Sequence, residues 1–558
     1  MNYKKPVYTM FRKRIIIALI VAPIIFTGAW LYKSGDIYFE IARNIDLFTR
    51  IYKEVTLNYV DDINPDEFLR SGIKGMLQNL DPYTVFIDEK RQDDIEMMTT
   101  GKYGGVGISV GIRDEKITIV EIMDGYSAQR QGLMIGDEIV AVDSVKLDKS
   151  MFDDVSLYVK GEPGTFVGLK IVRPGVTDTL LFSLVREEIQ VKNVTFADFV
   201  PAESGTAYIK LSGFNRGAGD ELRRSILNIQ KKGEIKEIVL DLRGNPGGLL
   251  ESAVDISSVF LPKGTLIVST MGKDSTSYKA YFSSKEPILP ETPLAVLVNG
   301  SSASASEIVA GAIQDHDRGI IVGERSFGKG LVQTISPLSN NTSLKITTSK
   351  YYTPSGRCIQ KVDYAKDNKV ITNSAETLPE KYLTDNKRTV FASGGILPDS
   401  SVTLSELSDF TRDLLAKGYI FRISSELIAV ANEKRYTESD SSLIREKTGR
   451  YLKEKGYVYK PQIVKKLEEI RESFKSKDDF AAISAEFNQL ISKAESAGSA
   501  NTLALPSDGV REVLSDIINR QGGSSEKIRY QLRFDHQYVT SVALVKNRNY
   551  IAKILNRK

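Results

Sequence analysis

The chain has 558 residues, of which 41% are hydrophobic and 26% charged, a composition typical of globular proteins. Its length predicts about three or four domains. The formal net charge of +4 comes from the N-terminus, because five basic residues and no acid precede residue 15, and the remainder sums to 4 − 5 = −1. Without a basic excess on the folded part, nucleic-acid binding is excluded as a function.

The N-terminal segment combines a basic flank, residues 1–14, with an uncharged run over residues 15–32 that closes with Trp30 and Tyr32. The run is just long enough to span a bilayer, and a basic flank stays in the cytoplasm. We therefore predict an inner-membrane anchor, with the rest of the chain exported to the periplasm or otherwise outside the cytoplasm. A cleaved signal peptide is the alternative, because residues 27–29 offer a small-residue cleavage site.

The remaining chain changes its pattern three times. Apolar residues at helical spacing predict a helical domain over residues 37–98. Short alternating strands with glycine turns predict a β-rich domain over residues 99–187. Strands alternating with helices predict an α/β core over residues 188–403, and residues 404–558 are charged and mainly helical. The expected fold class is multidomain α+β, with the β-rich domain inserted between the helical domain and the α/β core.

The β-rich domain opens with Tyr103-Gly104-Gly105-Val106-Gly107-Ile108 and later contains SAQRQGLMIGDEIVAV at residues 127–142. These two segments resemble a PDZ domain. In that family the amides of the glycine loop hold the terminal carboxylate of a peptide, which adds a strand to the sheet edge. The resemblance implies that Gly104, Gly105, Val106, Gly107 and Ile108 bind a peptide. A glycine turn in an unrelated β-domain is the alternative.

Two strand–turn–helix units stand out in the α/β core. They cover residues 237–260, with a turn at 243–248, and residues 294–315, with a turn at 299–303. Each turn presents backbone N–H groups at a helix start, where the partial positive charge favours an oxyanion. Both turns therefore suit acyl transfer, although a tight connection without function remains the alternative for the first.

Serines cluster at the second helix start, at Ser301, Ser302, Ser304 and Ser306. Helix capping alone explains such a cluster, because serine oxygens accept orphan amides. A lysine between two glycines, Lys329, favours catalysis instead, because a buried lysine beside a serine can lose its charge and act as a base.

Four segments of the core are similar to those of the C-terminal processing peptidases, also called tail-specific proteases. They are Asn245-Pro246-Gly247-Gly248, SASASE at 302–307, Phe327-Gly328-Lys329-Gly330 with Val332-Gln333, and GGILPD at 394–399. The resemblance covers roughly residues 37–401, including Leu80-Asp81-Pro82-Tyr83. One departure is Ser301, which stands where many relatives have glycine.

The resemblance implies a serine endopeptidase with Ser304 as nucleophile, Lys329 as base and Gln333 orienting the lysine. The oxyanion donors are then the Ala305 amide and one amide of the Gly247–Gly248 pair. Lysine is a poor base at its solution pKa of about 10.4, so Lys329 needs apolar cover, for which Phe327 and Val332 are candidates. The three other serines of the cluster are expected to tolerate alanine.

Two rival motifs overlap Lys329. Residues 323–329 imitate a phosphate-binding P-loop, but Gly330 lacks the hydroxyl that would bind magnesium. Ser326 to Lys329 fits the S-x-x-K of penicillin-binding proteins, and Lys447-Thr448-Gly449 supplies a K-T-G, but no S-D-N lies between them. We therefore consider both matches coincidental.

The chain contains only two histidines, His316 and His536, and one cysteine, Cys358. His316 stands near the far end of the Ser304 helix, ~18 Å from its start by helical rise, and cannot serve Ser304. Without paired histidines or thiolates we expect no metal and no cofactor. The position of Cys358 excludes a lipoprotein, and a lone cysteine cannot form an internal disulfide.

Together these features predict a membrane-anchored, exported endopeptidase that binds the C-terminal tails of exported proteins and cleaves them through Ser304 and Lys329. No nucleic-acid partner is expected, and a homo-oligomer stays open. The alternatives are a catalytically silent PDZ scaffold and an enzyme of acyl transfer on cell-wall peptides.

Overall fold

The computed structural model describes residues 37–113, 115–174, 176–364, 369–370, 380–392, 394–429, 435–474, 483–499 and 505–557. The chain forms two compact units, one ending at Phe86 and one starting at Ile87. The predicted anchor at residues 15–32 lies outside the described residues. Among the helices that are described, none has the length and apolar character needed to cross a membrane.

The first unit is helical. One helix covers residues 37–58, and α2 (Pro65–Leu77) follows. Asn64 caps α2, because its side-chain oxygen accepts the Asp66 N–H at 3.0 Å, and Pro65 suits the first helical turn. The expected helical N-terminus is confirmed.

The PDZ-like domain contains most of the short strands. They are β2 (Lys102–Gly105), β3 (Ile108–Arg113), β4 (Lys116–Ile122), β5 (Glu138–Val142), β6 (Val145–Lys146), β7 (Phe166–Val172), β8 (Leu180–Val185) and β9 (Glu187–Gln190). Sheet order is β3-β4-β5-β7-β8, with β6 beside β5, so β3 forms an edge. Strands β2 and β9 pair with each other at the entry and exit of the domain. Short helices α4 (Ser127–Arg130) and α5 (Val155–Val159) complete it.

The α/β core is built on a six-stranded sheet. Its strands are, in order, β10 (Val194–Phe199), β11 (Thr206–Leu211), β12 (Glu237–Asp241), β15 (Leu294–Val298), β16 (Ile320–Gly323) and β23 (Ser400–Ser401). All neighbours are parallel except β10 with β11. The predicted α/β core is therefore confirmed.

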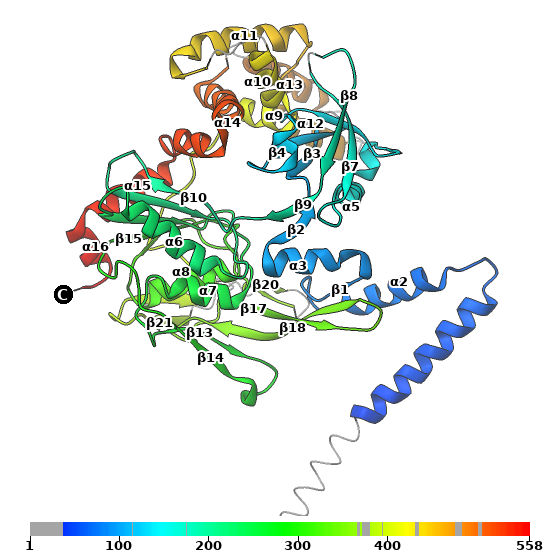
Figure 1. The fold of residues 1–558 in the computed structure, drawn as a ribbon. Coiled ribbons are helices and arrows are strands. Elements are labelled where there is room, and N and C mark those ends of the chain that lie inside the picture. Colours follow the sequence, from blue (N-terminus) through cyan, green and yellow to red (C-terminus); the bar gives the residue numbers. More distant parts are fainter. Residues whose placement is uncertain are drawn as a thin grey trace, which may run out of the picture. The chain divides into compact units, whose positions relative to one another are not determined.

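Helices cover both faces of this sheet. On one face, Ile238 and Leu240 of β12 pack with α6 (Ala218–Gln230), α7 (Leu250–Ser257) and α8 (Ala305–Asp315). On the other face, Val239 packs with α15 (His536–Lys546) and α16 (Arg548–Ile554). Figure 1 shows the red C-terminal helices beside the green strands of the sheet. Because both faces are buried, the strands read as continuous apolar runs, and the end of the chain completes the core.

A second sheet carries the chain that follows the lysine motif. It contains β13 (Leu266–Met271), β14 (Lys279–Phe282), β17 (Leu331–Pro337) and β18 (Ser343–Tyr352), paired antiparallel as β17-β18-β13-β14. Smaller hairpins are β19 (Val362–Asp363) with β20 (Lys369–Val370) and β21 (Glu380–Leu383) with β22 (Thr389–Ala392). The remaining short elements are β1 (Val85–Ile87) and α3 (Gln92–Thr100).

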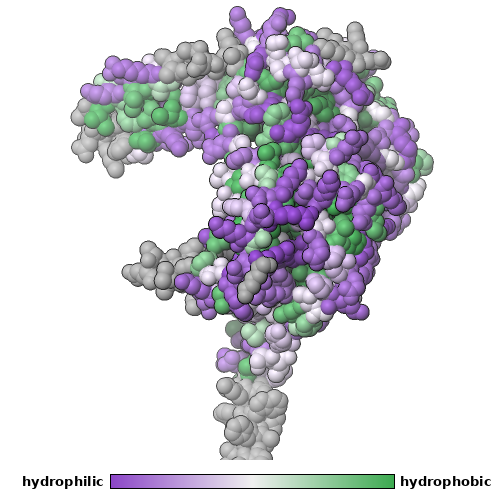
Figure 2. Space-filling model, turned by 90° about the vertical axis from the view of Figure 1, so that its left-hand side faces the viewer, coloured by the Kyte–Doolittle hydropathy of each residue, from purple (hydrophilic) through white to green (hydrophobic). Residues whose placement is uncertain are grey.

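The C-terminal helices form their own core. They are α9 (Asp409–Ala416), α10 (Tyr419–Ala429), α11 (Ser441–Glu454), α12 (Gln462–Phe474), α13 (Ser484–Ser499) and α14 (Ser507–Leu532). Buried Leu414, Ile423, Ile444 and Leu514 pack together in it. Polar side chains cover most of the face seen in Figure 2, with smaller apolar patches between them. The expected helical region is confirmed.

Candidate active site

Three neighbouring parallel strands bring the glycine, serine and lysine motifs together at their carboxyl ends. Strands β12, β15 and β16 lie side by side. The glycine turn (residues 243–248), the serine turn (299–304) and the lysine turn (324–330) follow them in that order. Ligand sites of parallel sheets form beyond the carboxyl ends of the strands, so an active site is expected at this end of the sheet.

Ser304 sits in a strained turn immediately before α8. Its backbone has φ 56° and ψ −114°, which is unusual for a residue with a side chain. Such a conformation costs about 1–3 kcal/mol and persists only where its surroundings enforce it. The side chain is half-buried. The helix therefore begins at Ala305, one residue later than predicted, because Ser304 leaves helical geometry.

Gly247 explains how the glycine turn reaches the serine turn. A Cβ at this position would lie 2.6 Å from the Ala303 carbonyl oxygen, 2.8 Å from the Ala305 nitrogen and 2.9 Å from the Ser304 Cβ. Its φ of +94° also lies in the region that favours glycine. Only glycine fits here, and the two turns are in direct contact.

Hydrogen bonds fasten the serine turn to the glycine turn. The Ala303 N–H and the Ser306 hydroxyl donate to the Asn245 carbonyl at 3.1 and 2.9 Å. The Ser302 hydroxyl donates to the Leu242 carbonyl at 2.8 Å. Ser302 and Ser306 are fully buried, whereas Ser301 is exposed. The expectation that the other serines tolerate alanine therefore changes for Ser302 and Ser306.

The three predicted oxyanion donors differ in their present partners. The Gly247 N–H already donates to the Asn245 side-chain oxygen at 3.0 Å. No hydrogen bond of the Gly248 or Ala305 N–H occurs among the described residues. Gly248 and Ala305 are thus the better placed pair for a developing negative charge, and the oxyanion hole stays a prediction.

A carboxylate that the sequence reasoning did not single out links the serine and lysine turns. Glu307 is completely buried. One of its oxygens accepts the Ser304 N–H at 2.8 Å and the Lys329 N–H at 3.0 Å. The other accepts the Ser326 hydroxyl at 2.6 Å and the Gly328 N–H at 2.7 Å. Glu307 therefore fixes the backbones of the predicted nucleophile and base relative to each other.

Burial raises the pKa of Glu307 to about 7. The hydrogen bonds from Ser326, Lys329, Gly328 and Ser304 lower the pKa but do not outweigh burial. The sequence contains one local indication that the Glu307 side chain contacts Ser304. Ser304 and Glu307 have the S-x-x-E spacing of a capping box, in which the glutamate side chain accepts the backbone N–H of the serine.

Ser326 is part of the same buried cluster and not a nucleophile. It is 4% exposed, and its hydroxyl donates to Glu307 and accepts the Ile396 N–H at 2.6 Å. Ile396 belongs to the GGILPD segment, whose Gly395 packs on Ser326. The S-x-x-K match is therefore structural coincidence, as the sequence indicated.

Lys329 is half-buried on its turn. Of its two candidate apolar covers, Val332 packs against the core, but Phe327 is 46% exposed. Gln333 donates its side-chain N–H to the Thr347 hydroxyl at 3.2 Å across β17 and β18. The roles of Lys329 and Gln333 stay predictions.

Buried Tyr351 connects the same two turns from β18. Its N–H donates to the Gly330 carbonyl at 2.9 Å, and its hydroxyl donates to the Ser304 carbonyl at 3.2 Å. The serine and lysine turns are thus tied together by a tyrosine as well as by Glu307.

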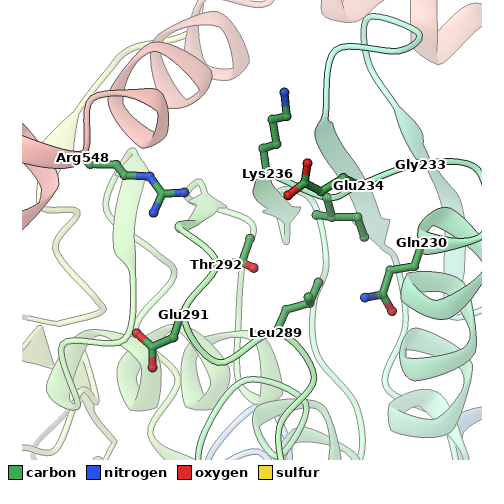
Figure 3. Close-up of a pocket in the computed structure, with 9 residues that line it drawn as sticks. Gln230, Gly233, Glu234, Lys236, Leu289, Glu291, Thr292 and Arg548 are labelled. Atoms are coloured by element: carbon green, nitrogen blue, oxygen red, sulfur yellow. The ribbon is translucent and has the colours of Figure 1, made fainter.

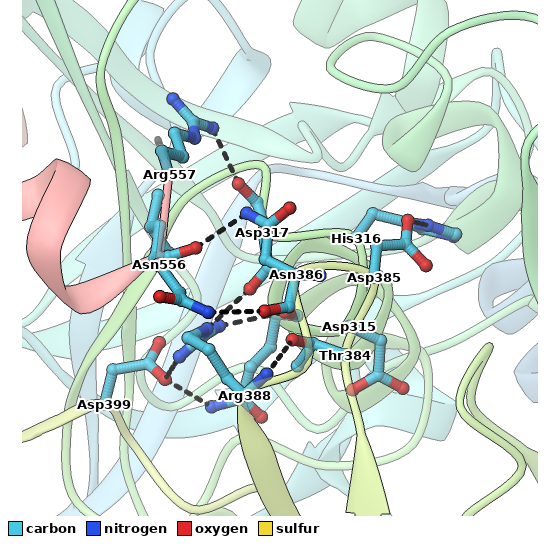
Figure 4. Close-up of polar contacts among 12 residues, drawn as sticks. Asp315, His316, Asp317, Thr384, Asp385, Asn386, Arg388, Asp399, Asn556 and Arg557 are labelled. Carbon is cyan, nitrogen blue, oxygen red and sulfur yellow. Dashed lines mark hydrogen bonds and ion pairs between the residues drawn. The ribbon is translucent and has the colours of Figure 1, made fainter.

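His316 lies at the opposite end of α8 from Ser304. Its ring nitrogens lie 2.7 Å from the Asp385 carboxylate and 2.7 Å from the Leu266 carbonyl oxygen. Figure 4 shows it beside the polar cluster around Arg388, which pairs with Asp317 and Asp399. His316 is therefore structural. Within the described ranges, no three His, Cys, Asp or Glu side chains form a group that could hold a metal ion.

One well-defined cavity is remote from this chemistry. It measures about 410 Å³ and lies at the amino ends of β12 and β15, the end opposite Ser304 (Figure 3). Its lining includes Lys236, Thr292 and Arg548. None of the predicted site residues reaches it.

The predicted peptide-binding residues divide between two strands of the PDZ-like domain. Gly104 and Gly105 lie in β2 and pair with Glu188 and Glu187 of β9. Val106, Gly107 and Ile108 lead into the edge strand β3. An edge strand offers unpaired backbone groups to an added peptide, so the second group is the better placed.

Comparison with known proteins supports the same assignment along the chain. Residues 205–370 match peptidase family S41, residues 94–172 match the PDZ domain, and residues 410–545 match a family described as the probable PDZ-protease C-terminal helical domain.

Curated relatives agree with these matches. The carboxy-terminal-processing protease of Bartonella bacilliformis is 38% identical, covering 62% of this chain and 77% of its own length. The carboxyl-terminal-processing protease of Synechocystis is 35% identical, covering 54% and 70%. Among solved structures, the photosystem II D1 C-terminal processing protease is 27% identical and covers 64% of this chain and 92% of its own, with a TM-score of 0.35. The chain belongs to the C-terminal processing peptidases of family S41, and it is a serine-type peptidase with a PDZ domain.

Proposed function

We propose that the protein is an exported endopeptidase that cleaves peptide bonds near protein C-termini through a Ser304–Lys329 acyl-enzyme mechanism. The observation that carries the proposal is the single Glu307 carboxylate, which accepts backbone N–H groups from both Ser304 and Lys329. A nucleophile in a strained turn and a lysine on the adjacent turn are what such a mechanism requires.

In the acylation step, the Ser304 hydroxyl oxygen attacks the scissile carbonyl carbon while the neutral Lys329 amine takes the hydroxyl proton. The tetrahedral oxyanion accepts hydrogen bonds from the Ala305 and Gly248 amides. When the intermediate collapses, the carbon–nitrogen bond breaks and Lys329 returns the proton to the leaving amine. Gln333 orients the amine of Lys329.

In the deacylation step, Lys329 takes a proton from water, and the hydroxide oxygen attacks the ester carbonyl. The same two amides stabilise the second oxyanion. Collapse breaks the bond between the carbonyl carbon and the Ser304 oxygen, Lys329 returns its proton to that oxygen, and the released carboxylic acid loses its proton to solvent. No metal or cofactor enters either step.

The PDZ domain provides substrate selection in this proposal. A protein tail adds as a strand to the open edge of β3, with its terminal carboxylate on the amides around Gly107. We further propose that residues 15–32 anchor the protein in the inner membrane with the peptidase outside the cytoplasm, and that protein tails in that compartment are the substrates.

The test uses purified protein and an unfolded substrate with an apolar C-terminus. Ser304→Ala and Lys329→Ala should each abolish cleavage, and a serine-reactive acylating probe should label Ser304 in the parent. A metal chelator should leave the rate unchanged. Cleavage by Ser304→Ala at the parental rate refutes the proposal. A parent that binds tails without cleaving them would indicate a scaffold, and labelling by a β-lactam would favour cell-wall chemistry.

A further inference from the structure

The glycine turn begins at Arg243, which is held in a buried polar cage. Asp241, at the end of β12, accepts the Arg243 backbone N–H and Nε at 2.9 Å each and Nη2 at 2.6 Å. The Tyr208 hydroxyl donates to the same carboxylate at 2.6 Å. Burial alone would raise the pKa of Asp241, but the charge and hydrogen bonds of Arg243 outweigh it and lower the pKa. Asp241 is thus an ionised partner of Arg243.

The other half of the cage comes from the C-terminal segment of the chain. Arg243 Nη2 lies 2.7 Å from an Asp535 carboxylate oxygen, and Nη1 donates to the Gln537 side-chain oxygen at 2.9 Å. Gln537 is fully buried, and its own N–H donates to the Val402 carbonyl at 2.7 Å. The arginine side chain is only 11% exposed. Displacing either partner would leave a buried cation partly unpaired.

The backbone of the glycine turn and its hydrogen bonds connect Arg243 to the predicted oxyanion donors. The next residue, Gly244, donates its N–H to the Asn299 side chain of the serine turn at 3.0 Å. The Asn245 side-chain oxygen accepts the Gly247 N–H, and the Asn245 side-chain N–H donates to the Leu211 carbonyl at 2.8 Å. Gly248 follows directly. A shift of the arginine would therefore move the glycine turn, whose Gly247 contacts Ser304.

We propose that Asp535 and Gln537 are positioning residues for the peptidase reaction, because they hold Arg243 and, through it, the turn that presents the Gly248 amide to the oxyanion. The inference rests on the proposed function. It gives Asp535 and Gln537, remote in sequence from the catalytic motifs, an indirect part in transition-state stabilisation.

The decisive variants are Asp535→Asn and Gln537→Leu. Asp535 also caps α15, since its second oxygen accepts the Tyr538 N–H at 3.0 Å. Asparagine retains that cap but turns an amide N–H₂ toward Arg243, so Asp535→Asn separates positioning from helix stability. The matched control is Arg529→Gln, which removes another ion pair between the C-terminal helices and the core, with Asp198.

Steady-state kinetics and a peptidyl boronate provide the readouts. A boronate forms a tetrahedral adduct on a serine oxygen and places a hydroxyl where the oxyanion develops. We expect each decisive variant to lower kcat by roughly 10- to 100-fold with KM unchanged, at a temperature where circular dichroism shows the variant fully folded, because small misplacements of a catalytic group have effects of this size. Because each variant removes a partner of the buried arginine, its thermal midpoint should also fall. Boronate affinity should fall by a similar factor. Arg529→Gln should change neither value.

Parental kcat and boronate affinity in both decisive variants would overturn the inference. So would a loss in kcat that the control shares, or one that disappears at temperatures where the variant is fully folded. The proposed function fails separately, if Ser304→Ala remains active. If Asp535→Asn does not fold, Gln537→Leu decides by the same measurements.

Discussion

Replacing Glu307 with glutamine tests the buried link between the serine and lysine turns. The carboxylate accepts four hydrogen bonds, two on each oxygen. Glutamine keeps one oxygen, and its N–H₂ fits best beside Ser326, whose hydroxyl can turn to accept. The Gly328 N–H then faces a donor. An unpaired buried N–H costs about 1–3 kcal/mol, so we expect Glu307→Gln to destabilise α8 and the lysine turn at low pH.

The pH dependence gives a sharper expectation. Burial raises the pKa of Glu307 to about 7 from 4.5. A carboxyl that binds its proton more tightly when folded stabilises the protein fully below its unfolded pKa, and this stability is lost as pH rises through the folded pKa. The difference corresponds to about 3 kcal/mol in all, of which roughly 2–3 kcal/mol falls between pH 5 and pH 8. Glutamine does not titrate, so only the parent loses this amount.

Hydrogen exchange of the α8 amides measures the effect locally. Both proteins should carry Ser304→Ala, so that neither cleaves itself during the experiment. The opening free energy of α8 in the Glu307 protein, relative to Glu307→Gln, should fall by roughly 2–3 kcal/mol from pH 5 to pH 8. Glu512→Gln is the matched control, because burial also raises the pKa of Glu512, but in α14. Parallel pH profiles for the protein with Glu307 and the Glu307→Gln variant would refute the reasoning.

Three further substitutions test other parts of the core. Gly247→Ala would place a Cβ 2.6 Å from a backbone oxygen at φ +94°; peptide cleavage assays should show a rate at least ~100-fold lower. Arg388→Leu leaves buried Asp317 and Asp399 without their cation, and urea unfolding of the core should show a loss of about 3–5 kcal/mol. Ser306→Ala removes a buried hydrogen bond to the glycine turn and should cost about 1–3 kcal/mol in the same assay.

Local patterns predicted much of the fold. The strand expected at residues 294–298 is β15, and the one expected at 237–242 is β12 within a residue. Both are buried on two faces, so their apolar runs were unambiguous. The helix start was misplaced by one residue, because Ser304 has the sequence of a helix N-terminus but a backbone held in a turn by its neighbours.

Contacts between distant segments escaped prediction. Glu307 showed a local capping-box spacing, yet its bonds to Ser326, Gly328 and Lys329 exist only because β15 and β16 are adjacent. Asp535 gave no signal at all. Its partner Arg243 lies almost three hundred residues earlier in the chain. Gln537, the other partner of Arg243, is 294 residues away from it. Sequence spacing cannot reveal such pairs without the sheet order.

These distant contacts explain how the strained backbone of Ser304, the proposed nucleophile, can persist. The conformation of Ser304 costs about 1–3 kcal/mol. Its N–H and carbonyl are both engaged, by Glu307 at 2.8 Å and by the Tyr351 hydroxyl at 3.2 Å. Each hydrogen bond contributes about 0.5–1.5 kcal/mol net, so the two together are enough to offset the strain. Because the same carboxylate holds the Lys329 backbone, the energy that fixes the serine also fixes the lysine turn. The two halves of the proposed dyad are therefore positioned by one buried group, and neither should be displaced without the other.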